Sequence, residues 1–444
     1  MQRVDALIRP RWTIRVEPQV RVEEQLAVAI DDGRIVAVLP VDEADRTFIA
    51  GARHDRPRHV LLPGLVNAHA HAAQSLFRGL ASDVPSARAL ERVEAVEARW
   101  LGAELVADGA RLAIAEMLLG GITCFADMYE HADVVAEAAI ESGIRAVLGM
   151  VVRDSPSAWA RDANEGIRKG LELHDRLRGD PRIGSAFAPW SPNDASDATL
   201  ARIRQLADEL EAPVHTQLHE TDVEIDASIA RFGLRPLGRL QKHGLVTPSL
   251  IGAHVNRLDA PEIYVLASAG ASVVHCPRAN LKLGNPACPV TELLQAGVNV
   301  ALGTGGAASS DRLDLWEEMQ TAALLGKHAA ADAAAVPAAT ALAMATINGA
   351  RSLGLDGEIG SLVAGKAADA ICVDLGRLAL QPVLDPLTRL VYAASSRDVS
   401  DVWVAGEHVV TNSELLRLDH DAIAAAADAW GRRLGAGAPG ESQR

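Results

Sequence analysis

Aromatic side chains are scarce in this chain of 444 residues, because Phe, Trp and Tyr together make up only 3% of it. Hydrophobic residues still reach 49%, which is enough to build a core, and that core must be mainly aliphatic. The length is large for one compact domain and suits a large domain with a smaller accessory one.

Basic residues are outnumbered by acidic ones, which leaves a formal net charge of −15. Nucleic acids and anionic membrane surfaces require a basic face on the protein that binds them. The charge therefore argues against both partners. It does not exclude a small nucleoside-like ligand.

Cysteines and long apolar runs are also few. The four cysteines are scattered without a Cys-x-x-Cys pair, so we expect buried thiols in a reducing compartment and no disulfide framework. No apolar run reaches 18 residues, and the first residues lack the apolar core of a signal peptide. We therefore expect a cytoplasmic protein that does not enter a membrane.

The two ends of the chain carry matching β-strand patterns. Apolar runs at 26–30 and 34–39 flank an Asp-Asp-Gly turn, which predicts a hairpin. Segment 360–374 reads as a turn followed by a strand, and 401–410 reads as a second hairpin. We predict one composite β-sandwich domain from 1–60 and 357–425, and a C-terminal helix with a polar tail at 426–444.

Between 61 and 356, short apolar strands alternate with amphipathic helical segments, of which 134–142, 163–177 and 200–210 are the clearest. This alternation predicts an α/β fold, a (β/α)8 TIM barrel with its active site at the C-terminal ends of the strands. The eight expected strands are 62–67, 122–126, 146–151, 183–187, 214–218, 250–253, 272–275 and 298–302.

His69 and His71 lie two residues apart after the first expected barrel strand. Residues at this spacing share one face of a strand, so both imidazoles can converge on one cation. A His-x-His pair also arises by chance in a chain with 14 histidines. Its place at the start of the barrel favours the metal-binding interpretation.

A second polar cluster, His-Thr-Gln-Leu-His-Glu at 215–220, closes the fifth expected strand. By the two-residue period, His215, Gln217 and His219 are expected on one face, and Glu220 follows where a loop begins. A carboxylate beside an activated water is the usual general acid–base in hydrolytic deamination. The alternative is a polar strand end that simply faces solvent.

Later strands end in further candidates. His254 and His275 close the sixth and seventh expected strands, and the glycine-rich segment 303–309 follows the eighth. One histidine at a strand end is more often a hydrogen-bonded core residue, but their recurrence at one rim favours a site. The glycine-rich segment is equally consistent with backbone approaching a ligand and with a flexible turn.

Five longer motifs are spread over nearly the whole chain. They are Gly-Leu-Val-Asn-Ala-His-Ala-His at 64–71, Ile-Thr-Cys-Phe-Ala-Asp-Met-Tyr at 122–129, Val-His-Cys-Pro at 274–277 with Asn-Leu-Lys-Leu at 280–283, Arg-Leu-Asp-Leu-Trp-Glu-Glu-Met at 312–319, and Gly-Ser-Leu-Val-Ala-Gly-Lys-Ala-Ala-Asp at 360–369. Together they resemble the amidohydrolase superfamily, in particular the 5-methylthioadenosine/S-adenosylhomocysteine deaminases and their triazine-hydrolase relatives. The resemblance implies a TIM barrel with a composite β-sandwich and one divalent metal, zinc or iron. It also implies hydrolytic loss of ammonia from an adenine-like ring.

The resemblance assigns roles residue by residue. His69 and His71 match the first two metal ligands, Glu220 the proton-shuttling glutamate, and His254 the histidine that orients water. The resemblance also implies two substrate contacts: Glu97 matches the acid that holds ribose hydroxyls, and Ser309 lies where the family contacts substrate. Relatives often dimerise, so a homodimer is expected.

The departures from the family pattern are concentrated in the site. Gln217 replaces a metal-binding histidine and could serve only as a weak ligand, because a neutral amide oxygen binds zinc poorly. Gly305 replaces an aspartate that binds the metal and receives a proton. Trp190 replaces a substrate-binding histidine in Ala-Pro-Trp-Ser-Pro-Asn at 188–193. The segment 86–94 replaces a tryptophan-bearing region of the family. The family's usual Pro-Glu-Ser-Asn reads Pro-Arg-Ala-Asn at 277–280.

Three functions remain open. The first is a deaminase of a nucleoside or heterocyclic amine, with an improvised third metal ligand such as His254 and with Trp190 stacking on the substrate. The second is a metal-free lyase, cyclase or isomerase that uses Glu220 and His254 as its acid–base pair. The third is a non-catalytic protein that keeps the pocket and binds the ligand without converting it.

Overall fold

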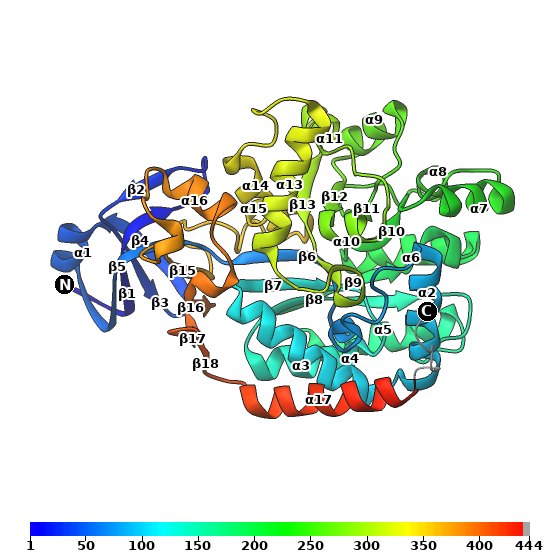
Figure 1. The fold of residues 1–444 in the computed structure, drawn as a ribbon, viewed down its shortest axis with the longest axis horizontal. Helices are drawn as coiled ribbons and strands as arrows, with labels where there is room; N and C mark the ends of the chain where they lie inside the picture. The colour runs from blue at the N-terminus through cyan, green and yellow to red at the C-terminus, as the bar shows by residue number, and fades with distance from the viewer. Residues whose placement is uncertain (438–444) are drawn as a thin grey trace.

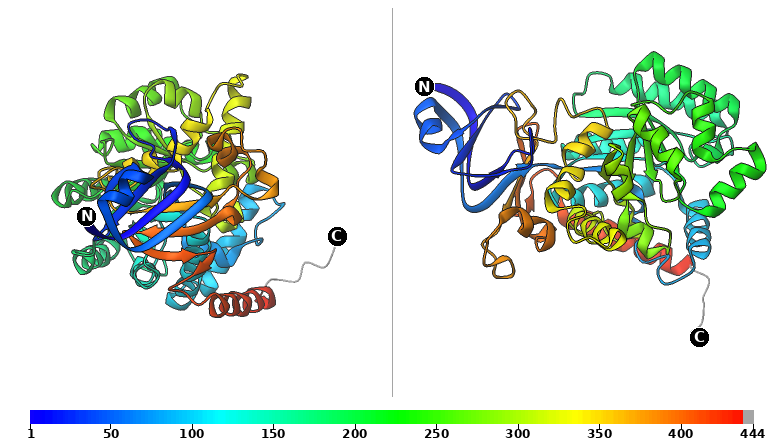
Figure 2. Two further views of the ribbon diagram at one scale, coloured as in Figure 1. Left: turned by 90° about the vertical axis from the view of Figure 1, so that its left-hand side faces the viewer. Right: turned by 90° about the horizontal axis from the view of Figure 1, so that it is seen from above.

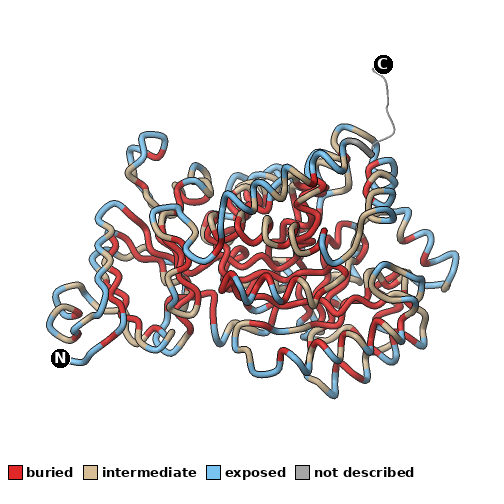
Figure 3. The backbone as a smooth tube through the Cα atoms, turned by 90° about the horizontal axis from the view of Figure 1, so that it is seen from below, coloured by how far each residue is buried: buried red, intermediate tan, exposed pale blue. Residues whose placement is uncertain are grey.

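The computed structural model describes residues 1–437, which form a parallel barrel and a separate mixed sheet beside it (Figure 1). The predicted α/β fold, a TIM barrel with a composite β-domain from both termini, is confirmed. Buried residues gather in the barrel and in the inner face of the sheet, as Figure 3 shows. Within the described range, no helix is both long and apolar enough to cross a membrane.

The barrel consists of eight parallel strands in sequence order, closed by a short ninth strand that pairs with the first. Closure is direct, because Thr304 N donates a hydrogen bond to His69 O at 3.0 Å. The strands are β6 (Leu65–His71), β7 (Ile122–Asp127), β8 (Arg145–Val152), β9 (Ile183–Pro189), β10 (Val214–Leu218), β11 (Leu250–His254), β12 (Ser272–His275), β13 (Asn299–Leu302) and β14 (Gly305–Gly306).

Helices between the strands cover the outside of the barrel. Segments 163–177 and 200–210 are helical as predicted, and both helices begin at a side-chain cap, Asp162 for the first and Ser196 for the second. The helices are α2 (Ser86–Trp100), α3 (Ala103–Leu119), α4 (Ala132–Ser142), α5 (Ala163–Leu177), α6 (Asp197–Leu210), α7 (Asp222–Phe232), α8 (Pro236–Lys242), α9 (Ala260–Ala269), α10 (Pro277–Lys282), α11 (Val290–Gln295), α12 (Ala307–Ser310), α13 (Leu315–Ala330), α14 (Ala338–Met344) and α15 (Ile347–Ser352).

The first barrel strand differs from the predicted 62–67. Leu62 pairs with Ile371 in the mixed sheet, and the barrel strand begins only after Gly64. A Cβ on Gly64 would lie 2.0 Å from Thr123 Oγ1, so only glycine fits where the chain passes between the two sheets. As a result, His69 and His71 lie inside strand β6 rather than beyond its end.

The mixed sheet joins the two ends of the chain, as Figure 2 shows from the end and from above. Its central strand β5 pairs in parallel with β1 and antiparallel with β15, so N-terminal and C-terminal segments share one sheet. The strands are β1 (Gln2–Ile14), β2 (Val22–Glu24), β3 (Leu26–Asp31), β4 (Arg34–Pro40), β5 (Phe48–Pro63), β15 (Ala370–Asp374), β16 (Val399–Val404), β17 (Glu407–Thr411) and β18 (Glu414–Leu415), with α1 (Val41–Thr47) and α16 (Pro386–Tyr392) beside them. Both predicted hairpins are therefore confirmed.

A buried ion pair connects the barrel to the mixed sheet. Arg145, at the start of β8, binds Asp369, just before β15, through two hydrogen bonds of 3.1 Å. Asp369 also accepts a hydrogen bond from Ala405 N at 2.8 Å, in the turn between β16 and β17. One carboxylate thus ties together three segments that are far apart in the sequence.

The C-terminal helix α17 (His420–Gly437) lies along α3 on the outside of the barrel (Figure 1). Its Trp430 donates a hydrogen bond to Asp108 at 2.8 Å. The end of the predicted polar tail, 438–444, falls outside the described residues. The exact domain boundaries stay a prediction.

Candidate functional site

A cavity of about 370 Å³ opens at the C-terminal ends of the barrel strands. Its inner wall is polar and carries His71, Gln217, Glu220, His254 and Gly305, each from a different part of the rim. Its outer wall is mainly apolar and comes from α2 and α7. This is the end of the barrel where catalytic residues of such folds gather.

His71 is held by two hydrogen bonds. Its Nδ1 lies 2.6 Å from the carbonyl oxygen of Met128, which can only accept, so Nδ1 carries the proton. Its Nε2 therefore has the lone pair and accepts a hydrogen bond from Gln217 Nε2 at 3.0 Å. Gln217 is thus hydrogen-bonded to Nε2 of His71, the nitrogen that would coordinate a metal ion if His71 were a ligand.

His69 is fully buried beside His71, with ring centroids 4.8 Å apart. Its Nδ1 lies 2.9 Å from His215 Nε2, and its own Nε2 has no hydrogen-bond partner. Burial lowers the pKa of His71 to about 4 and that of His215 to about 3. These imidazoles are therefore neutral near pH 7.

Trp190 covers the cavity floor directly after β9. Its indole stacks on the His71 ring, with centroids 5.2 Å apart and planes 20° apart. The Arg153 guanidinium lies 5.4 Å from the indole centroid, and Gln217 N donates to Trp190 O at 3.2 Å. The predicted aromatic residue is therefore in the cavity, but its face already contacts a side chain of the site.

Gly305 belongs to the short strand β14 within the glycine-rich segment, for which the sequence left a flexible turn and a ligand-contacting backbone open. β14 pairs Gly305 with Ala70 and Gly306 with His71. The φ of Gly305 is +62°, a left-handed conformation that favours glycine, with Asp and Asn next best tolerated. A Cβ would meet nothing closer than Ser309 Oγ at 3.6 Å, so the position has room for a side chain.

The donor set does not fit the metal that the resemblance implies. A catalytic zinc takes three protein ligands and a water. In residues 1–437, no three His, Cys, Asp or Glu side chains are placed to hold one ion. His71 Nε2 is engaged by Gln217, and Gly305 offers no side-chain donor.

Glu220 and His254, by contrast, share a connected polar network. His254 Nδ1 lies 3.0 Å from Asn280 Oδ1, which leaves Nε2 toward the cavity. Asn280 and Asn256 exchange hydrogen bonds of 2.8 and 3.1 Å, and Asn256 donates to Glu220 O at 3.1 Å. Asn285 donates to Glu220 Oε1 at 3.0 Å. Both predicted acid–base residues are therefore oriented by asparagines.

His254 also has an unusual backbone conformation, with φ +70° at the end of β11. Residues in this region cost free energy and persist where the surrounding structure holds them, often at functional sites. Val255 follows with φ +48° and bonds back to Leu218 O at 2.9 Å. The strand end is therefore fixed in the turn that aims His254 at the cavity.

Ser309 lines the cavity, as predicted, and Glu97 does not. Glu97 lies behind the wall, where its carboxylate accepts hydrogen bonds from Tyr129 and, at 3.2 Å, from Gln74. Burial raises the pKa of Glu97. Gln74 therefore stands between Glu97 and the ligand space, and the role of Glu97 with ribose stays a prediction.

The expectation that His219 shares a face with His215 and Gln217 is wrong. β10 ends at Leu218, and His219 has φ +52°, which turns its side chain away from the cavity. Its Nδ1 contacts Arg257 O at 3.0 Å, and its Nε2 accepts from Leu237 N at 3.0 Å. His219 is a structural residue.

Several residues that support the site were not identified from the sequence. Glu224 accepts the backbone N–H of Glu220 at 2.8 Å and so holds the loop that follows β10. The Thr-x-x-Glu pattern at 221–224, which is typical of a helix start, was the available signal. The other missed residues carried no such signal. They are Gln74, Tyr129, Asn256 and Asn285.

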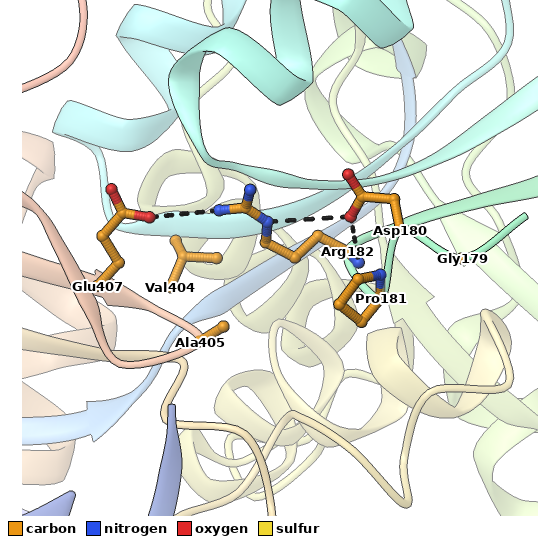
Figure 4. Close-up of a pocket in the computed structure, with 7 residues that line it drawn as sticks. All are labelled: Gly179, Asp180, Pro181, Arg182, Val404, Ala405 and Glu407. Carbon is orange, nitrogen blue, oxygen red and sulfur yellow. Dashed lines mark hydrogen bonds and ion pairs between the residues drawn. The ribbon is translucent and has the colours of Figure 1, made fainter. Parts of the chain in front are cut away.

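A second hollow of about 470 Å³ lies where the barrel meets the mixed sheet (Figure 4). Arg182 crosses it and pairs with Glu407 at 3.3 Å and with Asp180 at 4.0 Å. Its charge is thus balanced within the protein. The hollow is a surface cleft at the domain junction and offers no unpaired polar group to a ligand.

The buried histidines predict acid sensitivity. The pKa of His275, buried with both ring nitrogens unpaired, falls to about 3, as does that of His215. The unfolded chain binds these protons below about pH 6.5, so each of these two histidines lowers the free energy of unfolding by about 1.4 kcal/mol per pH unit as pH drops from 6.5 toward 4. Asp127 and Glu224, whose pKa burial raises to about 7, act in the opposite direction over the same range, so the contribution of one histidine is measured as the difference between a variant and the wild type. Urea unfolding at pH 7.5 and pH 5 gives this difference.

The variant His275→Asn isolates one contribution and should reduce the loss of stability between the two pH values. His420, whose side chain is 72% exposed, supplies the control His420→Gln. Equal pH dependence in both variants and the wild type would contradict this account.

Comparisons with known proteins place these features in a family. Residues 60–409 match the model of the amidohydrolase family. The chain is 46% identical over 434 residues to the 5-methylthioadenosine/S-adenosylhomocysteine deaminase of Teredinibacter turnerae, and 98% of each chain is covered.

Comparison with solved structures leads to the same family. The fold is similar to that of an adenosine deaminase from Xanthomonas campestris with bound zinc, with a TM-score of 0.97 and 45% identity over 98% of this chain and 99% of that one. It is also similar to the zinc complex of atrazine chlorohydrolase from Arthrobacter aurescens, with a TM-score of 0.89 and 28% identity over 96% and 99%. The predicted family and hydrolase class are thus confirmed, and the chain belongs to the amidohydrolase family.

Proposed function

We propose that the cavity binds a nucleoside-like heterocyclic amine and that Glu220 and His254 act on its C–N bond in hydrolytic deamination. The observation that carries the proposal is the network of asparagines that aims both side chains into one cavity. The names of the relatives, which include deaminases of adenine nucleosides, support the substrate class.

The reaction adds water to the ring carbon that bears the amine and releases ammonia. Asn280 holds His254 by Nδ1, and in the neutral ring with its proton on Nδ1 the Nε2 lone pair accepts a hydrogen bond from the water and orients it. Glu220 takes one proton from the attacking water and delivers it to the ring nitrogen. It then takes the second proton from the new hydroxyl group and delivers it to the amine, which leaves as ammonia. Asn285 holds one oxygen of Glu220, so the carboxyl group keeps a single orientation.

The zinc bound in the similar adenosine deaminase and atrazine chlorohydrolase structures suggests a divalent ion as a cofactor. In this chain, His69 and His71 would hold it, and the Gln217 amide is a poor third donor. A homodimer and a cytoplasmic location stay predictions.

Fewer side chains are placed to recognise the substrate than to carry out the proposed reaction. The Ser309 hydroxyl lines the cavity, and its present hydrogen bond goes to Gly306 O at 2.9 Å. The indole of Trp190 already stacks on His71 and has Arg153 over its ring, so a heterocycle contacts its edge. Glu97 can reach ribose hydroxyls only after Gln74 moves.

Ammonia release tests the proposal. Purified protein is incubated with adenosine, 5-methylthioadenosine, S-adenosylhomocysteine and an aminotriazine, and ammonia is measured with a coupled enzyme. Turnover of one of them, lost in Glu220→Gln, is the expected result. A metal-free lyase, cyclase or isomerase would instead convert a ligand without releasing ammonia.

A second candidate is a binding protein without turnover. It is favoured by the His71–Gln217 hydrogen bond and by the absence of a side chain at Gly305. Thermal stabilisation by one of the same compounds without ammonia release would identify it, because a ligand at 100 times its Kd adds about 2.7 kcal/mol to the stability.

A further inference from the structure

We propose that Gln217, Trp190 and Gly305 together replace the family's metal site with a ligand-binding surface that needs no metal. On this surface, the Gln217 carboxamide recognises the amine-bearing ring. The inference rests on the proposed substrate class. It goes further, because it assigns a role to three residues that depart from the family pattern.

The first part of the argument is the state of His71. Both of its nitrogens have protein partners, Met128 O at 2.6 Å and Gln217 Nε2 at 3.0 Å. A zinc ion would lie about 2.0–2.1 Å from Nε2, in the direction that Gln217 now fills. Binding an ion would require breaking this hydrogen bond and would leave the carboxamide without its partner.

The second part is Trp190, which holds the same imidazole from its face. The stack of 5.2 Å and the backbone hydrogen bond from Gln217 N to Trp190 O fix indole and carboxamide to one another. Arg153 lies over the indole at 5.4 Å. The residues after β9 and in β10 thus form one packed unit around His71.

The third part is Gly305. Its left-handed backbone and open surroundings mean that no side chain reaches across from β14 toward His69 or His71. Strand β14 therefore supplies no carboxylate to complete an ion's coordination. His69 Nε2 remains a buried nitrogen without a hydrogen-bond partner in the protein.

The chemistry of Gln217 suits an amine-bearing heterocycle. Its NH₂ group donates to His71, and its carbonyl oxygen is left to accept from an exocyclic amine. A carboxamide pairs a donor with an acceptor, which is the pattern that recognises the amine edge of adenine. Since Gln217 is half-buried on the cavity wall, such a bond is formed away from bulk water.

The test measures metal and ligand separately. Wild-type protein is exposed to zinc, desalted and analysed by plasma mass spectrometry, and 5-methylthioadenosine binding is measured by calorimetry with and without chelator. We expect zinc far below one ion per chain and equal binding in chelator. Gln217→Ala should weaken binding about tenfold, because it removes one buried hydrogen bond.

Restoring the donors supplies the complementary variant. Q217H/G305D should retain about one zinc per chain, whereas Gln205→His, the same exchange on exposed helix α6, should retain none. If Q217H/G305D does not fold, the single variant Q217H takes its place, and its zinc content is compared with that of the wild type. Wild-type protein that keeps about one zinc per chain, or loses probe binding in chelator, overturns the inference.

The outcomes also separate this inference from the proposed function. Probe binding in chelator without ammonia release supports the inference and contradicts the proposed deamination. Ammonia release that requires retained zinc contradicts the inference and supports the proposed deamination. Failure of 5-methylthioadenosine to bind at all overturns the recognition role of Gln217.

Discussion

Glu220→Gln is expected to slow ammonia release by about 10²–10⁴-fold, because it removes a carboxylate of the cavity wall that can both take and deliver the proton. The amide keeps the shape of the side chain and its contact with Asn285, so binding of the substrate should change little. The measurement is kcat and KM for whichever amine the wild type converts. We expect the loss in kcat.

The matched control is Glu209→Gln, because Glu209 lies exposed on α6 and bonds only to Gln205, at 2.7 Å. Its kinetics should equal those of the wild type. Unchanged turnover in Glu220→Gln would show that another group moves the proton and would remove the basis of the proposed mechanism.

Asp369→Asn is expected to destabilise the protein by about 3–5 kcal/mol, because it leaves the buried Arg145 guanidinium without its counter-charge. The two side chains are only 5% and 1% exposed, and their hydrogen bonds join the barrel to the mixed sheet. Urea unfolding followed by circular dichroism measures the loss. The double variant R145M/D369L should recover part of it, since no unpaired charge then remains buried.

The control is an exposed pair of the same chemistry. Arg168 and Glu172 lie 2.7 Å apart on α5 with side chains more than half exposed, so Glu172→Gln should cost under about 1 kcal/mol. Equal losses in Asp369→Asn and Glu172→Gln would contradict a special role for the buried pair.

Much of the fold was predictable because it depends on local pattern. Alternating strands and helices indicated the barrel, and strand patterns at both ends indicated one sheet from the two termini. The boundary at Gly64 was not predictable, because the run 60–63 is equally apolar in either sheet. Only the pairing of Leu62 with Ile371 assigns it to the mixed sheet.

The candidate site divides in the same way. Sequence alone determined the residue types at the rim, including Gln217 and Gly305 at positions where the resemblance implies metal ligands, because strand ends and motif positions are local properties. Only the tertiary structure decided what these residues contact. It set Gln217 against His71, stacked Trp190 on the same ring and placed Glu97 behind Gln74. The physical reason is that such contacts join neighbouring strands far apart in sequence, and backbone turns such as that at His219 redirect side chains in ways that spacing does not reveal.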